Sequence, residues 1–236
     1  EVPRGLGHLA GMAEAMSRIH NPWGHYPRNE RVDPKTQYPT MHRPHAASKW
    51  TTSGIPGGVR MTWTGLSNGS RTFPDESLTV SAWTDPRTGA LLFRGSGSSP
   101  EGGVYGVQVP VGNLHPQHRM YVASFGGNLY DSRGKPGLIT LGGTPFWEAP
   151  VVAIEGRQGS LGVWVEAAEC PPDFFFMNWS GKSFSVAIEH LNLMPFEQHK
   201  NVESVTWRLD AFAGGWVAAM TPYRDWYANA FAEELR

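Results

Sequence analysis

Short apolar runs separated by connections rich in glycine and proline follow one another along most of this chain. In 204–210, Val205 and Leu209 occupy alternating apolar positions between polar neighbours, which is the two-residue period of a strand with one face in water. The connection from Asp85 to Gly89 combines a proline that fixes φ with a glycine that accepts positive φ, as in a hairpin turn. By this pattern, strands are predicted at 59–66, 78–84, 90–95, 104–111, 119–125, 137–141, 151–155, 161–166, 183–191 and 202–212.

Many short strands joined by tight turns favour a mainly β protein, with an antiparallel β-sandwich as its architecture. The chain has 236 residues, which fits one large all-β domain. We assign 59–236 to the sandwich and 1–58 to an N-terminal helix and a proline-rich loop that cover it. An amphipathic helix is expected over 221–236, with Thr221 as its cap and Pro222 in its first turn. Its aromatic stripe either packs on the sheet or leads into a further domain.

Composition narrows the classes of partner. The formal net charge is -1, and lysine and arginine are scattered along the chain, so nucleic acid is not expected to bind. No apolar run is long enough to cross a bilayer, and we expect a soluble protein, secreted or periplasmic. The single cysteine, Cys170, can form no internal disulfide and is interpreted as a structural thiol. The chain contains 10 tryptophans, more than a core of this size needs, so some indole rings should lie at the surface.

Four segments resemble a known domain when their order is considered: 77–94, 107–114, 147–154 and 207–216. They are similar to the β-sandwich that precedes the catalytic barrel in large glycoside hydrolases of the alpha-galactosidase-like type. The resemblance implies a supersandwich of the galactose-mutarotase-like kind, whose closing strand leads through a Gly-Trp turn and an aromatic helix into a (β/α)₈ barrel. It also implies that the carboxylates of the family's barrel lie outside this chain, and the N-terminal 58 residues depart from the family's opening strands.

Sugar recognition requires flat apolar surfaces and planar amides or carboxylates that bind neighbouring hydroxyls. Two clusters, 145–148 and 174–182, fit this description, and a third, 20–26, lies in the proline-rich loop. We interpret 174–182 as a loop that follows two prolines. The candidate saccharide-binding residues are Trp147, Asn178, Trp179, Trp23, His25 and Tyr26. Core packing of the aromatic rings and coverage of a sheet edge remain the alternatives for these residues.

An enzymatic reading needs two carboxylates that face each other across a glycosidic bond. Glu148, Glu166 and Glu169 are the catalytic candidates, although no spacing singles out a pair and a solvated strand end would explain Glu166 and Glu169 equally well. The His42/His45 and His115/His118 pairs each contain a proline and have no third ligand, so no metal is expected. No cofactor fingerprint is present in its required setting.

Three functions therefore stand as hypotheses. The first is a carbohydrate-associated β-sandwich domain of a glycoside hydrolase, which binds or frames an oligo- or polysaccharide beside a catalytic barrel carried elsewhere. The second is a self-contained carbohydrate-active enzyme that uses a Glu/Asp pair. The third is a structural or assembly protein whose aromatic C-terminal helix contacts a partner chain or a second copy of itself.

Overall fold

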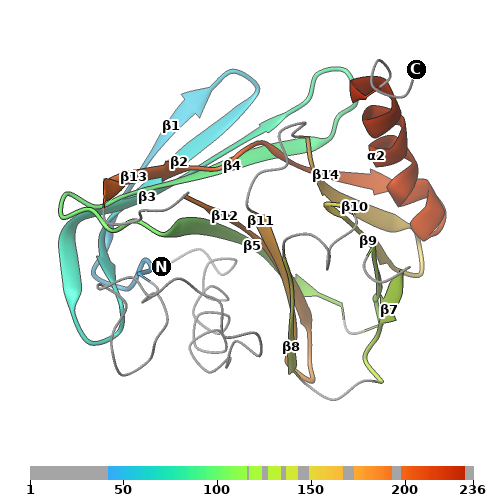
Figure 1. Ribbon diagram of the computed structural model, residues 1–236, viewed down its shortest axis with the longest axis horizontal. Helices are drawn as coiled ribbons and strands as arrows, with labels where there is room; N and C mark the ends of the chain where they lie inside the picture. Colours follow the sequence, from blue (N-terminus) through green and yellow to red (C-terminus); the bar gives the residue numbers. More distant parts are fainter. Residues whose placement is uncertain are drawn as a thin grey trace.

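The computed structural model describes most of the chain after residue 41 and shows two layers of antiparallel strands with one helix on the outside (Figure 1). The described residues are 42–115, 117–123, 127–133, 137–142, 149–166, 173–192 and 198–231. The expected N-terminal helix, most of the proline-rich loop and Cys170 lie outside this part of the chain. The mainly β, antiparallel architecture with a C-terminal helix is confirmed.

The larger sheet is open, and its strands pair only in antiparallel fashion. In spatial order it contains β1 (Lys49–Ile55), β2 (Gly58–Ser67), β3 (Thr72–Thr84), β4 (Leu91–Ser98), β14 (Trp207–Phe212), β10 (Ser160–Val165), β9 (Val151–Glu155), β6 (Arg119–Val122) and β7 (Asn128–Tyr130). A short strand, β13 (Asn201–Glu203), pairs with the far end of β4. The smaller sheet runs in the order β5 (Gly106–Leu114), β12 (Phe184–Leu191), β11 (Asp173–Trp179) and β8 (Gly137–Gly142).

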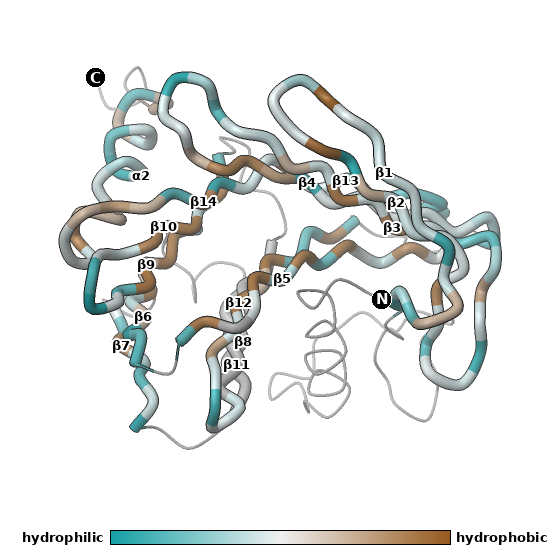
Figure 2. The backbone as a smooth tube through the Cα atoms, turned by 180° about the vertical axis from the view of Figure 1, so that it is seen from behind, coloured by the Kyte–Doolittle hydropathy of each residue, from teal (hydrophilic) through white to brown (hydrophobic). Residues whose placement is uncertain are grey.

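The core lies between the two sheets, where both layers present apolar side chains (Figure 2). Because strand positions alternate between faces, Val163 and Val165 of β10 point inward. The buried cluster consists of Phe93, Leu114, Met120, Val122, Val152, Ile154, Val163, Val165, Phe184, Val186, Ile188 and Trp207. We call this side of the larger sheet its inner face and the opposite side its outer face.

A glycine sets the distance between the layers at one point. A Cβ placed on Gly95 of β4 would lie 2.8 Å from a methyl group of Val109 and 3.1 Å from one of Val107, both in β5. Any side chain here would push the sheets apart, because packed interiors leave no room for an extra methyl group.

The outer face carries the helix α2 (Trp216–Ala230), which packs across β9, β10 and β14. Tyr223 of the helix lies against Val151 and Trp164, and all three are buried. Gly162 makes this contact possible: a Cβ at this position would lie 2.6 Å from the carbonyl oxygen of Ala219 and 2.9 Å from the ring of Trp164. Tyr223 and Trp226 of the aromatic stripe therefore pack back onto the sheet, whereas Tyr227 is exposed.

Two expected boundaries are wrong. The helix begins at Trp216 instead of Thr221, and Pro222 lies inside it. The local reason is the turn before the helix, where Gly214 has a φ of 108° and Gly215 is extended, so helical residues follow at once. The Thr221 hydroxyl donates to the carbonyl of Val217 and caps nothing. At the other end, β1 occupies part of the segment expected to be loop.

The hairpin turn after β3 is confirmed. The backbone N–H of Asp85 donates to the carbonyl of Ala90 at 2.8 Å, and Gly89 has a φ of 79°. Within the described residues, no helix has the length and apolarity needed to span a membrane.

Candidate functional site

Most of the residues expected to bind saccharide or to act as catalytic carboxylates cannot be placed. Those outside the described residues are Trp23, His25, Tyr26, Trp147, Glu148 and Glu169. Three remain: the backbone of Asn178 and Trp179, and the whole of Glu166. Their role in binding or catalysis stays a prediction.

Asn178 and Trp179 lie at the end of a strand, and the interpretation of 174–182 as a loop is wrong. Both belong to β11, an interior strand of the smaller sheet that pairs with β12 and β8. Asn178 is opposite Ser185 in one neighbour and Leu138 in the other. The aromatic run has high strand propensity, and pairing on both sides outweighs the two prolines that precede it. Only 180–183, with Gly181 at a φ of 83°, forms a turn.

Glu166 lies just after β10 and belongs to a cluster of charged groups around Arg208 of β14. Nη1 of Arg208 donates to the Glu166 carboxylate at 3.2 Å and to the Asp85 carboxylate at 3.0 Å. Nη2 donates to the Thr88 hydroxyl and lies 3.8 Å from the Asp210 carboxylate. Arg208 is buried, with 7% of its surface exposed, so these partners compensate a cation removed from water.

The electrostatics of this cluster, which we call the Arg208 cluster, favour the charged form of Asp85. The backbone N–H of Arg87 lowers the pKa of Asp85 to about 2, and Thr88 and Arg208 add to the effect against the opposing cost of burial. The guanidinium of Arg208 also lies 5.4 Å from the ring centre of Trp164. The general acid of a glycoside hydrolase requires the opposite, a carboxyl group whose pKa is raised. The geometry of Glu166 and Asp85 therefore fits a structural ion-pair cluster.

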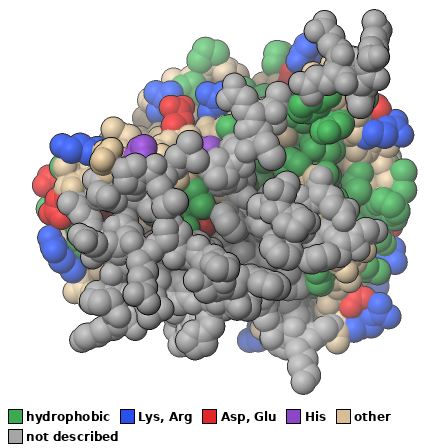
Figure 3. Space-filling model, in the orientation of Figure 1, with side chains coloured by type: hydrophobic (Ala, Val, Ile, Leu, Met, Phe, Trp, Pro, Cys, Tyr) green, Lys and Arg blue, Asp and Glu red, His purple; other side chains and the backbone are tan. Residues whose placement is uncertain are grey.

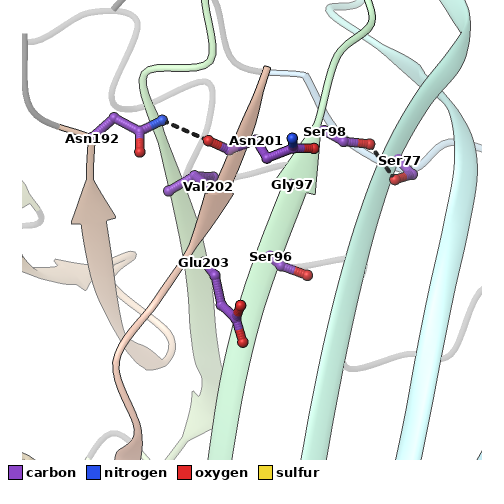
Figure 4. A pocket seen from close by; sticks show the side chains of 8 residues that line it. All are labelled: Ser77, Ser96, Gly97, Ser98, Asn192, Asn201, Val202 and Glu203. Atoms are coloured by element: carbon purple, nitrogen blue, oxygen red, sulfur yellow. Dashed lines mark hydrogen bonds between the residues drawn. The ribbon is translucent and has the colours of Figure 1, made fainter. Parts of the chain in front are cut away.

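A shallow polar groove of about 340 Å³ lies on the larger sheet where β13 joins β4 (Figure 4). The Ser77 and Ser98 hydroxyls hydrogen-bond across β3 and β4 at 2.7 Å. The Asn192 amide donates to the backbone carbonyls of Val104 at 2.8 Å and Asn201 at 3.0 Å, which fixes its orientation. The groove is lined by Ser77, Ser96, Gly97, Ser98, Asn192, Asn201, Val202 and Glu203.

Hydroxyls, an amide and one carboxylate give this groove the groups that bind neutral polar molecules. The carboxylate of Glu203 is 70% exposed and lies 3.9 Å from the guanidinium of Arg94. Among the described residues, no aromatic side chain lines the groove, so these residues offer no flat apolar surface to a sugar ring. Sequence reasoning missed the groove. The available signal was the recurrence of serine or threonine at alternate positions of 77–81 and 96–98, which is equally typical of a strand face in water.

The two histidine pairs do not converge on a common point. The rings of His115 and His118 meet edge to face at 5.9 Å, and burial lowers the pKa of His118, with a smaller effect from His115. His42 instead hydrogen-bonds Glu76 at 2.5 Å and stacks on Phe73. Among the described residues, no group of three or more histidine, cysteine or acidic side chains could hold a metal ion.

Two indole rings do lie at the surface, as the tryptophan content predicts. Trp50 of β1 is 51% exposed and Trp216 of α2 is 40% exposed, whereas Trp164 and Trp207 are buried. Trp216 stacks on Tyr121 of β6, with ring centres 5.1 Å apart and an interplanar angle of 17°. The contact between Trp216 and Tyr121 was not predicted from the sequence, because one residue lies on a helix and the other on a strand far away in the chain.

No protein-family model matches the sequence, and no curated protein matches it. Solved structures with a similar fold include three of alpha-N-acetylgalactosaminidase NagBb from Bifidobacterium bifidum. The TM-score is 0.53 with 12% identity for the ligand-free structure and 0.51 with 12% identity for the GalNAc complex. For a quadruple mutant, the TM-score is 0.51 with 10% identity.

Each of these matches covers 78% of this chain and 30% of the NagBb chain. The chain therefore spans less than a third of the length of the structures it resembles. The predicted resemblance to a domain of a larger glycoside hydrolase is confirmed at the level of the fold.

Proposed function

We propose that this chain is a carbohydrate-associated β-sandwich domain of a glycoside hydrolase, which binds or frames a saccharide beside a catalytic barrel. The observation that carries the proposal is the extent of the structural match: 78% of this chain corresponds to 30% of an alpha-N-acetylgalactosaminidase. A match of this kind supports a domain within a larger enzyme more than a complete enzyme. A galactose-mutarotase-like relation and a secreted or periplasmic location remain parts of this proposal.

The surface chemistry is compatible with a polyol ligand. The groove at β13 offers hydroxyl, amide and carboxylate groups, and Trp216 offers an exposed indole ring. Such groups together satisfy both requirements of sugar binding, hydrogen bonds to hydroxyls and flat surfaces for the C–H faces.

The self-contained enzyme receives less support. Glu166, the one catalytic candidate that the structure describes fully, is bound by Arg208 in the cluster that also holds Asp85. The ion pair with a buried guanidinium accounts for the position of this carboxylate without a catalytic role.

A contact with another protein chain is the second candidate, because α2 exposes apolar side chains. Val217 is 57% exposed and Tyr227 is 46% exposed, next to the partly exposed Trp216. Figure 3 shows hydrophobic side chains between charged ones along the right-hand edge of the molecule, where α2 lies. These exposed apolar residues suit contact with a protein partner, in addition to contact with a sugar.

One experiment separates the three functions. The purified chain is applied to a glycan microarray that includes N-acetylgalactosamine-, galactose- and glucose-terminated oligosaccharides, and is incubated with aryl glycosides such as 4-nitrophenyl α-N-acetylgalactosaminide. We expect glycan binding without release of nitrophenol.

Two outcomes would contradict the proposed function. Release of nitrophenol at a rate that depends on Glu166 would favour the self-contained enzyme. Silence in both assays, together with concentration-dependent self-association in light scattering, would favour the assembly protein.

A further inference from the structure

A compact group of four side chains lies beside the first turn of α2 on the outer face of the larger sheet. Trp216 is the first residue of the helix, and its ring stacks on Tyr121 at 5.1 Å. The guanidinium of Arg119 lies 5.9 Å from the centre of the Tyr121 ring and 3.1 Å from the carboxylate of Glu155. We call these four residues the Trp216 platform.

Two contacts hold the platform in place. The Glu155 carboxylate is only 17% exposed. Burial of Tyr121 raises the pKa of its hydroxyl, and the hydrogen bond and negative charge of Glu155 raise it further. The Ser160 hydroxyl donates to the carbonyl of Gly215 at 3.0 Å, which anchors the residue before Trp216. The orientation of the indole ring is therefore set before any ligand arrives, and preorganisation of this kind reduces the entropic cost of binding.

The absence of a side chain at residue 215 brings the carboxylate to the start of the helix. A Cβ at Gly215 would lie 3.0 Å from Oε1 of Glu155. The first turn of α2 contains no acidic residue, and its cap residue offers no side chain. Glu155 therefore supplies the negative charge that a helix N-terminus favours, from a neighbouring strand. Its other contacts, to Arg119 and Tyr121, face the platform.

This combination of groups fits a sugar ring. A pyranose presents an apolar C–H face, which packs on a flat aromatic ring, and equatorial hydroxyls at its edge. Trp216 remains 40% exposed after stacking on Tyr121, so ring surface is left for a ligand. Arg119 is half exposed and offers planar donors beside the rings, while Glu155 offers acceptors.

A protein partner fits the same surface less well. The centre of a protein interface is depleted of Glu and Asp, whereas here the carboxylate of Glu155, paired with Arg119, lies beside the aromatic pair. Covering this pair with an apolar partner would remove a partly hydrated ion pair from water, which is costly. A sugar leaves the pair hydrated or replaces water with hydroxyls.

We propose that the Trp216 platform is a pyranose-binding subsite, with Trp216 and Tyr121 as its stacking surface and Arg119 and Glu155 as its hydrogen-bonding edge. The inference rests on the proposed carbohydrate-associated function and names the surface that performs it.

The test uses the whole chain and the same glycan microarray, followed by titration calorimetry with the oligosaccharide that gives the strongest signal. Trp216→Ala should weaken binding by about tenfold, which corresponds to about 1.4 kcal/mol, because the stacking surface is lost. Trp50→Ala is the matched control, because Trp50 is equally exposed but lies on β1, and it should bind as the wild type does.

A second variant guards against loss of the helix contact. Arg119→Met keeps an unbranched chain at a half-exposed position and removes the planar donors. It should fold normally by circular dichroism and bind several-fold more weakly. If Trp216→Ala melts at a lower temperature than the wild type, the Arg119→Met result decides.

The outcomes distinguish this inference from the function on which it rests. If the wild type binds a glycan and both variants bind equally well, the subsite is wrong and the proposed function stands. If the wild type binds no glycan, both are wrong. If it instead self-associates, and Trp216→Ala abolishes that association, the platform is a protein contact.

Discussion

The outer face of the larger sheet has two halves with opposite chemistry. Under α2 the face is apolar at its centre, where Tyr223 of the helix covers Val151 of β9 and Trp164 of β10. Across β2, β3 and β4 the helix is absent and the face carries hydroxyls, with Thr62 bonded to Thr79 at 2.9 Å and Ser77 bonded to Ser98 at 2.7 Å. The two halves belong to one continuous sheet.

The inner face differs little between β4 and β10, since Phe93 and Val163 join the same core. What distinguishes the two halves is therefore the partner of the outer face, a helix in one and water in the other. The Arg208 cluster lies at their boundary, where Trp164 contacts the guanidinium. The predictions below test whether the outer-face residues themselves create this division.

The largest effect is expected at Gly162, which lets the helix approach the sheet. Gly162→Val places methyl groups where the carbonyl of Ala219 already lies 2.6 Å from a Cβ. We expect the free energy of unfolding to fall by about 3 kcal/mol, because the helix must move away from its apolar face. Urea denaturation followed by circular dichroism measures this.

Gly54→Val is the matched control on β1. A Cβ at Gly54 meets no atom within 4 Å, so the same substitution should change stability by no more than about 0.5 kcal/mol. Equal losses in the two variants would show that the helix contact at Gly162 has no special importance.

A reciprocal exchange of isosteric residues tests the two halves directly. Val151→Thr buries a hydroxyl under the helix, at a residue that is 3% exposed, and should cost about 1.5 kcal/mol. Thr79→Val on the open half removes one surface hydrogen bond and should change stability by less than about 0.5 kcal/mol. Denaturation midpoints of both variants under the same conditions give the difference, and a costly Thr79→Val would contradict the division.

The smallest effect is expected at the boundary and appears only in acid. The pKa of Asp85 is lowered to about 2 in the folded protein from its ordinary value of 3.8, so the charged form is favoured on folding. Its contribution to stability is complete above pH 3.8 and is lost as the pH falls toward 2. Carboxyl carbon chemical shifts should show a midpoint near pH 2.

Thr88→Val removes one of the groups that stabilise the charged form. The Asp85 midpoint should then rise toward 3.8 without reaching it, because the backbone N–H of Arg87 is the largest cause of the lowered pKa and is retained. An unchanged midpoint would mean that the Thr88 hydroxyl does not stabilise the charge.

The strands and turns follow from local patterns and were predictable to a large extent. The apolar runs at 151–155 and 161–166 became β9 and β10, two strands buried on both faces. The turn from Asp85 to Gly89 was identified from its proline and glycine, and Asp85 itself accepts the N–H of Arg87 at 2.9 Å. These features depend on residues close together in the sequence.

The features that were not predictable depend on distant residues. The helix begins at Trp216, directly after the turn at Gly214 and Gly215, and Gly215 lies beside the Glu155 carboxylate of β9, which the sequence around Thr221 does not reveal. β11 forms because it has a partner on each side, which a reading of its own residues could not show. The Trp216 platform and the Arg208 cluster likewise arise only when separate strands are assembled.

Gly162 also constrains how a sequence of this fold can diverge. Any larger residue at this position requires a compensating change that lifts or removes the helix, and removal of the helix would leave Val151 and Trp164 uncovered. The glycine, the helix and the two residues beneath it therefore have to change together, because a single substitution among them would disturb the packing of the others. Related chains would therefore either keep the glycine, the helix and the two covered residues, or replace all of them with a hydroxyl-bearing surface like that of β2 to β4.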